Sequence, residues 1–216
     1  MQKIAVVLSG NGVFDGAEIH EATLSMLAIS RKGGSYQVFA PDVEQHHVIN
    51  HLNGEEMDET RNVLVESARI ARGKAVNLKL FNPAEFDGLL FPGGFGAAKN
   101  LCSWAFEGTE ASVLAEVEDA IKGMVEQEKP IGALCISPVI LAKILGNVQL
   151  TIGDDKGTAQ AVESVGATHV NTTHGEVVLD NSYKVVTTPC YMLDASIDQI
   201  AVGAENVVSA MMEMME

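Results

Sequence analysis

The chain has 216 residues, of which 47% are hydrophobic and 20% are charged, and its formal net charge is −15. This composition excludes intrinsic disorder and is typical of a globular protein that buries a sizeable core. The length favours a single domain covering residues 1–216. Because an acidic surface repels phosphate groups, we expect neither nucleic acid nor a membrane as a partner.

The cysteine content indicates reduced thiols rather than a disulfide scaffold. The chain has three cysteines, an odd number, and none lies in a C-x-x-C pair, which also argues against a structural zinc site. The apolar run at residues 4–8 is shorter than a signal peptide requires, and no run approaches the ~18 apolar residues of a membrane helix. These observations predict a cytoplasmic protein.

Short apolar runs alternate with helical patterns along the chain. In chain order they predict strand 4–8, helix 17–31, strand 36–40, strand 88–91, helix 113–125, strand 131–134, helix 138–145 and helix 157–165. Strands at 177–179 and 184–188 flank a hairpin turn at Asn181-Ser182, and a final helix begins at Leu193. Residues 46–66 are polar and then helical, and we expect them at the sheet edge or over a site. The alternation predicts an α/β fold with a mainly parallel sheet and helices on both faces.

Cys135 is the first candidate for a catalytic nucleophile. An apolar strand, IGAL, delivers this residue directly to a turn where a helix begins, as in a nucleophile elbow. Ala133 and Ser137, two residues before and after it, are small enough for the strand and helix to pass closely. The positive end of the helix favours the thiolate, which is the reactive form. The alternative is a structural cysteine buried in the core.

The loop PGGFG at residues 92–96 is the second candidate element. It leaves the carboxyl end of a predicted strand, where parallel α/β sheets bind their ligands. Consecutive glycines leave backbone N–H groups unobstructed by side chains. We expect the amide of Gly93 or Gly94 to join that of Ile136 in an oxyanion hole. The alternative is a tight turn that simply needs glycine.

The loop SGNGVFDGAE at residues 9–18 follows the first strand. Asp15 stands where a dinucleotide fingerprint has its third glycine, so we expect no nicotinamide or flavin cofactor. Glu18 begins the first helix and is our candidate to hydrogen-bond Cys135 and shuttle a proton, with Glu21 and Asp15 as competitors. The alternative for Glu18 is a carboxylate that complements the helix dipole. Asn11 is a further candidate for substrate binding.

The histidines give a weaker signal, because none adjoins Cys135 in sequence. His174 is the best candidate to complete a Cys–His–Glu triad. His47 and His51 are four residues apart, but no helix and no third ligand is evident there, so we expect no metal. Cys190, after the residues TTP, is a candidate for the border of the cleft. Four polar residues near the candidate cleft have no assigned role: Arg61, Asn62, Lys99 and Asn100.

These residues resemble a known superfamily. GAE at 16–18, PGGFG at 92–96 and Cys135 together are similar to the PfpI-type, class I glutamine-amidotransferase-like proteins, which include the Parkinson-associated protein deglycases. The resemblance is closest to the ElbB (enhancing lycopene biosynthesis) branch and covers nearly the whole chain. The strings that carry it are LSGNGVFDGAEIHEA, VINHLNGE, ETRNVLVESARIARG, PGGFGAAKNL, LTIG and VVTTPCYML.

The resemblance implies a flavodoxin-like three-layer sandwich, pairing of Cys135 with Glu18, and a homodimer. It also implies a cofactor-independent glyoxalase that turns glyoxal into glycolate, with the ancestral glutaminase triad not kept. We therefore expect the Cys135 thiolate to add to a small aldehyde, and Gly94 and Ile136 to hold the oxyanion. One alternative is a non-catalytic redox-sensing or regulatory protein linked to isoprenoid metabolism. The other is a glutamine amidotransferase.

Overall fold

The computed structural model describes residues 1–215, and its centre is a seven-stranded sheet in the order β10-β11-β7-β6-β1-β2-β5. All neighbouring strands run parallel except β10, which pairs antiparallel with β11. The strands are β1 (Lys3–Val7), β2 (Ser35–Ala40), β5 (Ala75–Asn77), β6 (Gly88–Phe91), β7 (Ile131–Leu134), β10 (Val178–Asp180) and β11 (Val185–Thr188).

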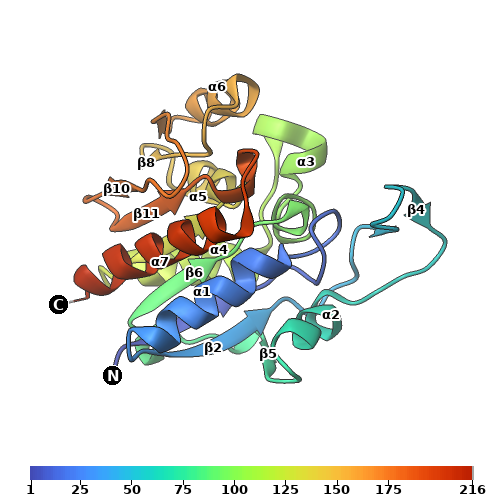
Figure 1. Cartoon of the computed structure of the whole chain (residues 1–216), viewed down its shortest axis with the longest axis horizontal. Coiled ribbons are helices and arrows are strands. Elements are labelled where there is room, and N and C mark those ends of the chain that lie inside the picture. Colours follow the sequence, from blue (N-terminus) through green and yellow to red (C-terminus); the bar gives the residue numbers. More distant parts are fainter. Residues whose placement is uncertain (216) are drawn as a thin grey trace.

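Helices cover both faces of this sheet, as Figure 1 shows for the face that carries α1 and α7. In β1, Ile4 and Val6 pack with residues of α1 and α7, whereas Ala5 and Val7 pack with residues of α4 and α5. This is why the central strands are continuously apolar. The helices are α1 (Ile19–Arg31), α2 (Val63–Ile70), α3 (Trp104–Glu107), α4 (Ala115–Glu126), α5 (Pro138–Leu145), α6 (Lys156–Ser164) and α7 (Ile197–Glu213).

The predicted fold class, a flavodoxin-like sandwich with a mainly parallel sheet, is confirmed. The main differences lie at helix starts. The first helix begins at Ile19 because the Glu18 side chain caps it, and the last begins at Ile197 because Ser196 and Gln199 form a capping box. The fourth helix begins at Ala115 rather than residue 113, since Val113 forms a β-bridge with Cys102.

The segment 46–66, left unplaced by the sequence, forms a hairpin of β3 (Val48–Ile49) and β4 (Glu56–Met57), and α2 begins within its last residues. The hairpin projects from the side of the sheet on which the parallel strands end (Figure 1). Asp15 anchors it by accepting the Ile49 N–H at 2.7 Å. Asn100 accepts the His46 N–H and donates to the carbonyls of Ser9 and Asp15. A second small sheet pairs β8 (Gln149–Leu150) with β9 (Thr168–His169).

Within residues 1–215, no helix is both long and apolar enough to cross a bilayer.

Candidate active site

Cys135 occupies a sharp turn between β7 and α5. Its φ is 59°, in the left-handed region that residues other than glycine seldom adopt. The turn is held by hydrogen bonds from the Cys135 N–H to Thr188 O at 3.0 Å and from the Ser137 N–H to Leu134 O at 3.0 Å. The Ser137 hydroxyl donates to Pro92 O at 2.7 Å and so ties the start of α5 to the glycine loop. The side chain of Cys135 is therefore fixed at the carboxyl end of β7.

A glycine loop closes over this sulfur. The N–H groups of Gly94 and Ile136 donate to Cys135, whereas the N–H of Gly93 donates to the Glu21 carboxyl at 2.8 Å. Of the two glycines considered from the sequence, Gly94 thus faces the sulfur. A Cβ on Gly93 would overlap Cys135 and lie 2.6 Å from Glu21 Oε2, so only glycine fits there. Gly94 has φ +94°, which also favours glycine.

Glu21, from the first turn of α1, supplies the carboxyl group that contacts Cys135. Its side chain is completely buried and hydrogen-bonds the Cys135 thiol. Glu21 Oε1 accepts the Tyr191 N–H at 3.3 Å, and Oε2 accepts the Gly93 N–H. The site therefore joins α1, the glycine loop, the elbow and the turn after β11.

Glu18, the carboxylate that we expected to contact Cys135, instead caps the first helix. Its Oε2 accepts the Glu21 N–H at 2.7 Å, which caps α1. A side chain that turns back to cap its own helix does not reach the elbow, and the residue three positions later takes that contact. The structure thus assigns to Glu18 the capping alternative and to Glu21 the contact with the thiol. The Glu18 N–H donates to Gly93 O rather than to the Glu21 side chain, so the two glutamates do not form a capping box and their spacing gave no signal for their roles.

Burial controls the ionisation of Cys135 and Glu21. It raises the pKa of the Glu21 carboxyl to about 8, and the nearby charge of Glu18 acts in the same direction. Burial also raises the pKa of the Cys135 thiol well above its usual range, although the N–H groups of Gly94 and Ile136 act against it. Cys135 as a whole residue is 6% exposed. The expectation that the helix start would favour the thiolate is therefore wrong for the resting site, because desolvation outweighs the helix dipole and the amides.

Cys190 and Tyr191 lie next to Cys135 and Glu21. Cys190 is buried with φ 43°, and burial together with the charges of Glu21 and Cys135 raises the pKa of its thiol. The Tyr191 hydroxyl lies 2.8 Å from His20 Nδ1, and His20 is exposed. The sequence did not predict the contact of Tyr191 with His20, because the backbone turn at Cys190 that brings Tyr191 to α1 has no sequence signature.

The other candidates lie away from the sulfur. His174 is exposed and lines a separate cavity with Val170, Val202 and Asn206, so the structure does not place it in a triad. Asn11 is half-buried in the first loop, and within residues 1–215 its side chain has no hydrogen bond. Asn62 caps α2, whereas Arg61 pairs with Glu59 and Glu66. Asn100 holds the hairpin as described above, and Lys99 lines a cavity beside the glycine loop.

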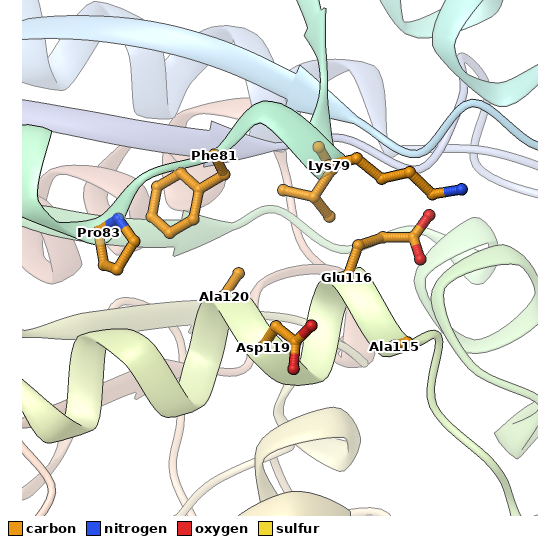
Figure 2. Close-up of a pocket in the computed structure, with 8 residues that line it drawn as sticks. Lys79, Phe81, Pro83, Ala115, Glu116, Asp119 and Ala120 are labelled. Carbon is orange, nitrogen blue, oxygen red and sulfur yellow. The ribbon is translucent and has the colours of Figure 1, made fainter.

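A different cavity, of about 310 Å³, lies between α4 and the chain that follows β5. Figure 2 shows Phe81 and Pro83 on one wall and α4 on the other, with Lys79 and Glu116 pointing toward one another. None of its lining residues comes from the elbow, the glycine loop or the first loop. It is therefore not part of the thiol site.

A mainly parallel sheet with a cysteine at a strained elbow defines a PfpI-type, class I glutamine-amidotransferase-like protein. The comparisons identify the branch. The chain is 45% identical to the rat ES1 protein homolog, mitochondrial, over 98% of this chain and 84% of that protein. It is 44% identical to the human glutamine amidotransferase-like class 1 domain-containing protein 3, mitochondrial, over 98% and 83%. The chain belongs to this ES1 family.

A solved structure agrees with this assignment. The isoprenoid biosynthesis protein with amidotransferase-like domain from Ehrlichia chaffeensis is 35% identical, with a TM-score of 0.94 over 100% of both chains. This confirms the resemblance to the ElbB branch. Glyoxalase III from Candida albicans shares the fold at 17% identity, with a TM-score of 0.62 over 97% of each chain. No family model matches the chain.

The comparisons contradict the predicted cytoplasmic location. Both the rat and the human relative carry the word mitochondrial in their names. The prediction rested on the number and spacing of cysteines and on the short apolar run near residue 4. Cysteine usage reports redox conditions and does not distinguish one reducing compartment from another.

Proposed function

We propose that this protein is a thiol enzyme that converts small 2-oxoaldehydes such as glyoxal into hydroxy acids such as glycolate, without a cofactor. One observation carries the proposal: a buried thiol at a strained elbow contacts a buried carboxyl, with two backbone N–H groups directed at the sulfur. The glyoxalase III name of a fold neighbour is consistent with this chemistry. The nearly sealed thiol favours substrates of only a few heavy atoms.

In the resting site, Glu21 is neutral at pH 7, since its pKa is about 8. The reactive form arises in the fraction of molecules in which Glu21 has released its proton to solvent, because its carboxylate can then accept the proton of the Cys135 thiol. The two amides at Gly94 and Ile136 then stabilise the thiolate and, after addition, the substrate oxyanion. Glu21 thus takes the proton-shuttling role that the sequence gave to Glu18.

The reaction balances without an external oxidant. The thiolate of Cys135 forms a C–S bond with one aldehyde carbon of glyoxal, and the oxyanion takes up a proton to give a hemithioacetal. Glu21 removes the C–H proton of that carbon and returns a proton to the neighbouring aldehyde carbon, which oxidises the first carbon to a thioester and reduces the second to an alcohol. Water then cleaves the C–S bond, which releases glycolate and restores the thiol.

The two alternatives have less support. A glutamine amidotransferase activates its cysteine with histidine, and among residues 1–215 no histidine hydrogen-bonds Cys135. A redox sensor needs an accessible thiolate, whereas Cys135 is a buried residue and burial raises the pKa of its thiol.

The test is turnover of ¹³C-labelled glyoxal to glycolate, followed by NMR with metal-free protein. The wild type is expected to produce glycolate above a protein-free control. Cys135→Ala and Glu21→Gln are each expected to lose at least a hundredfold in kcat/KM, because they remove the nucleophile and the proton carrier.

Cys102→Ala is the matched control. Cys102 is also a buried cysteine, but it lies among the residues packed against α4 and α5 rather than at the elbow. This variant is expected to keep wild-type turnover. Wild type without turnover, or Cys135→Ala with undiminished turnover, would refute the proposal.

A further inference from the structure

A cavity of about 460 Å³ adjoins the glycine loop, and neither Cys135 nor Glu21 lines it. Its lining residues come from the first loop, the β3–β4 hairpin, the glycine loop and the segment before and within α3: Phe14, Ile49, Gly54, Phe95, Lys99 and Ala105. This volume is within the range of small-molecule sites, ~300–1,000 Å³. Phe95 directly follows Gly94, but Cys135 does not line the cavity.

Two aromatic rings form exposed walls. Phe14 is 38% exposed and Phe95 is 48% exposed, so both rings present apolar surface at the cavity. Phe14 stacks on His51 with ring centroids 4.9 Å apart, and the Phe14 N–H donates to His51 Nε2 at 3.2 Å. The Phe95 N–H donates to Val13 O at 2.7 Å. Both backbone segments are therefore held in place, and the rings present preorganised apolar surface.

Lys99 supplies a cation to the same cavity. Its Nζ donates to Phe14 O at 2.7 Å, lies 2.9 Å from His47 Nε2 and is 5.3 Å from the centre of the Phe95 ring. An ammonium has three N–H donors, and these two contacts use two of them. Within residues 1–215, no carboxylate forms an ion pair with Lys99.

The groups around Lys99 set the charge that a ligand would meet. Burial lowers the pKa of the half-buried Lys99 ammonium, and the charges of Asp15 and Glu56, which form no ion pair with it, act to raise that pKa. His47 adds no second positive charge at neutral pH, because burial and the charge of Lys99 lower the pKa of its imidazole. The third N–H of Lys99 is therefore available to an anionic acceptor.

We propose that this cavity binds a small organic carboxylate with a flat apolar body. The apolar body packs against Phe14 and Phe95, and the carboxylate accepts a charge-assisted hydrogen bond from Lys99. A cationic ligand of the same shape is disfavoured because it would meet the ammonium. The proposal does not depend on aldehyde turnover, since none of its contacts involves Cys135 or Glu21.

The test is calorimetric titration of the full chain with three probes of one shape: 2-naphthoate, 2-naphthamide and 2-naphthylmethylamine. We expect 2-naphthoate to bind roughly tenfold or more tightly than the amide, and the amine to bind most weakly. Phe95→Ala is expected to weaken 2-naphthoate and 2-naphthamide to a similar degree. Cys135→Ala is expected to bind 2-naphthoate as the wild type does.

Lys99→Gln is expected to lose roughly tenfold in affinity for 2-naphthoate and to bind the amide unchanged, whereas Lys99→Arg retains the preference. Lys143→Gln is the matched control, because Lys143 Nζ also donates to a backbone carbonyl, that of Thr109, in another part of the molecule. It is expected to bind like the wild type. Equal binding of the three probes by the wild type, absence of binding by all three, or unchanged 2-naphthoate affinity in Lys99→Gln overturns the proposal.

Discussion

At the scale of single residues, the site depends on two buried groups that each carry a proton at neutral pH. Cys135 has a strained φ of 59°, and Glu21 accepts two backbone N–H groups while it contacts the thiol. Burial of the thiol and the carboxyl raises both pKa values, so neither group ionises readily alone. Once Glu21 has released its proton to solvent, its carboxylate can accept the proton of the thiol, and the amides at Gly94 and Ile136 are in place to receive the negative charge.

The sequence could not decide between Glu18 and Glu21 by spacing alone. Both carboxylates stand at the start of α1, and both were candidates. The direction of each side chain depends on the cap at Glu18 and on the absence of a Cβ at Gly93. The second condition involves a residue 72 positions away from Glu21, which a local pattern does not contain.

Glu18→Gln tests the charge that Glu18 places beside Glu21. The glutamine oxygen can still accept the Glu21 N–H, so the cap of α1 is kept, but the negative charge is removed. Because the charge of Glu18 raises the pKa of Glu21, this pKa is expected to fall. The rise of kcat/KM with pH, which follows ionisation of Glu21, is expected to move to lower pH. An unshifted profile would show that the charge of Glu18 does not act on the pair.

At the scale of elements, the continuous apolar runs predicted β1, β6 and β7 correctly, because a strand covered on both faces is apolar throughout. β2 and β11 were also predicted, from short runs rich in β-branched and aromatic residues. The three-residue strand β10 was predicted at 177–179, but five other short strands were missed. β3, β4, β5, β8 and β9 are too short for alternation to appear, and their pairing depends on the rest of the fold. The elbow was predictable because strand, cysteine and helix follow one another directly.

Gly93→Ala tests the close approach of the glycine loop to the elbow. A Cβ at Gly93 would overlap Cys135 and crowd Glu21 Oε2, so the loop must move. We expect a loss of about 1–3 kcal/mol in the free energy of unfolding and a large loss of turnover. Denaturant unfolding and the glyoxal assay measure the two effects.

Gly157→Ala is the matched control in α6. Its Cβ would meet its nearest atom, Asp155 Oδ2, at 3.5 Å, which is ordinary contact. This substitution is expected to leave turnover unchanged and to stabilise the helix slightly, by about 0.5–1 kcal/mol. If Gly93→Ala were as well tolerated as Gly157→Ala, the described packing of the loop on the elbow would be incorrect.

At the scale of the whole molecule, the parallel order of β11, β7, β6 and β1 brings four loops to one edge of the sheet. These loops contribute Glu21 at α1, the glycine loop, Cys135 and Tyr191. The sequence predicted which loops meet, because the carboxyl ends of parallel strands share one edge. It did not predict how deeply the thiol is buried, because exposure depends on side chains from all four loops.

The buried Glu21 also links the stability of the whole chain to pH. Its pKa is about 8 in the folded protein and 4.5 when exposed. Between pH 4.5 and about pH 8, the folded state therefore holds a proton that the unfolded chain has already released. The contribution of Glu21 to stability is therefore lost as the pH rises from about 4.5 to about 8. Glu21→Gln removes this dependence, and its stability relative to wild type is expected to increase over that window by a few kcal/mol.

Glu126→Gln is the matched control for charge, because Glu126 is an exposed residue of α4. Denaturant unfolding at several pH values is expected to give this variant the same pH dependence as the wild type. A Glu21→Gln variant whose curve runs parallel to that of the wild type would mean that Glu21 ionises normally in the folded protein.

The most direct measurement of the Cys135–Glu21 pair is a ¹³C NMR titration of the protein with labelled glutamate side-chain carboxyls. The account predicts one carboxyl that titrates near pH 8 and whose signal is missing from Glu21→Gln. Titration of every glutamate near its ordinary value of about 4.5 would contradict it.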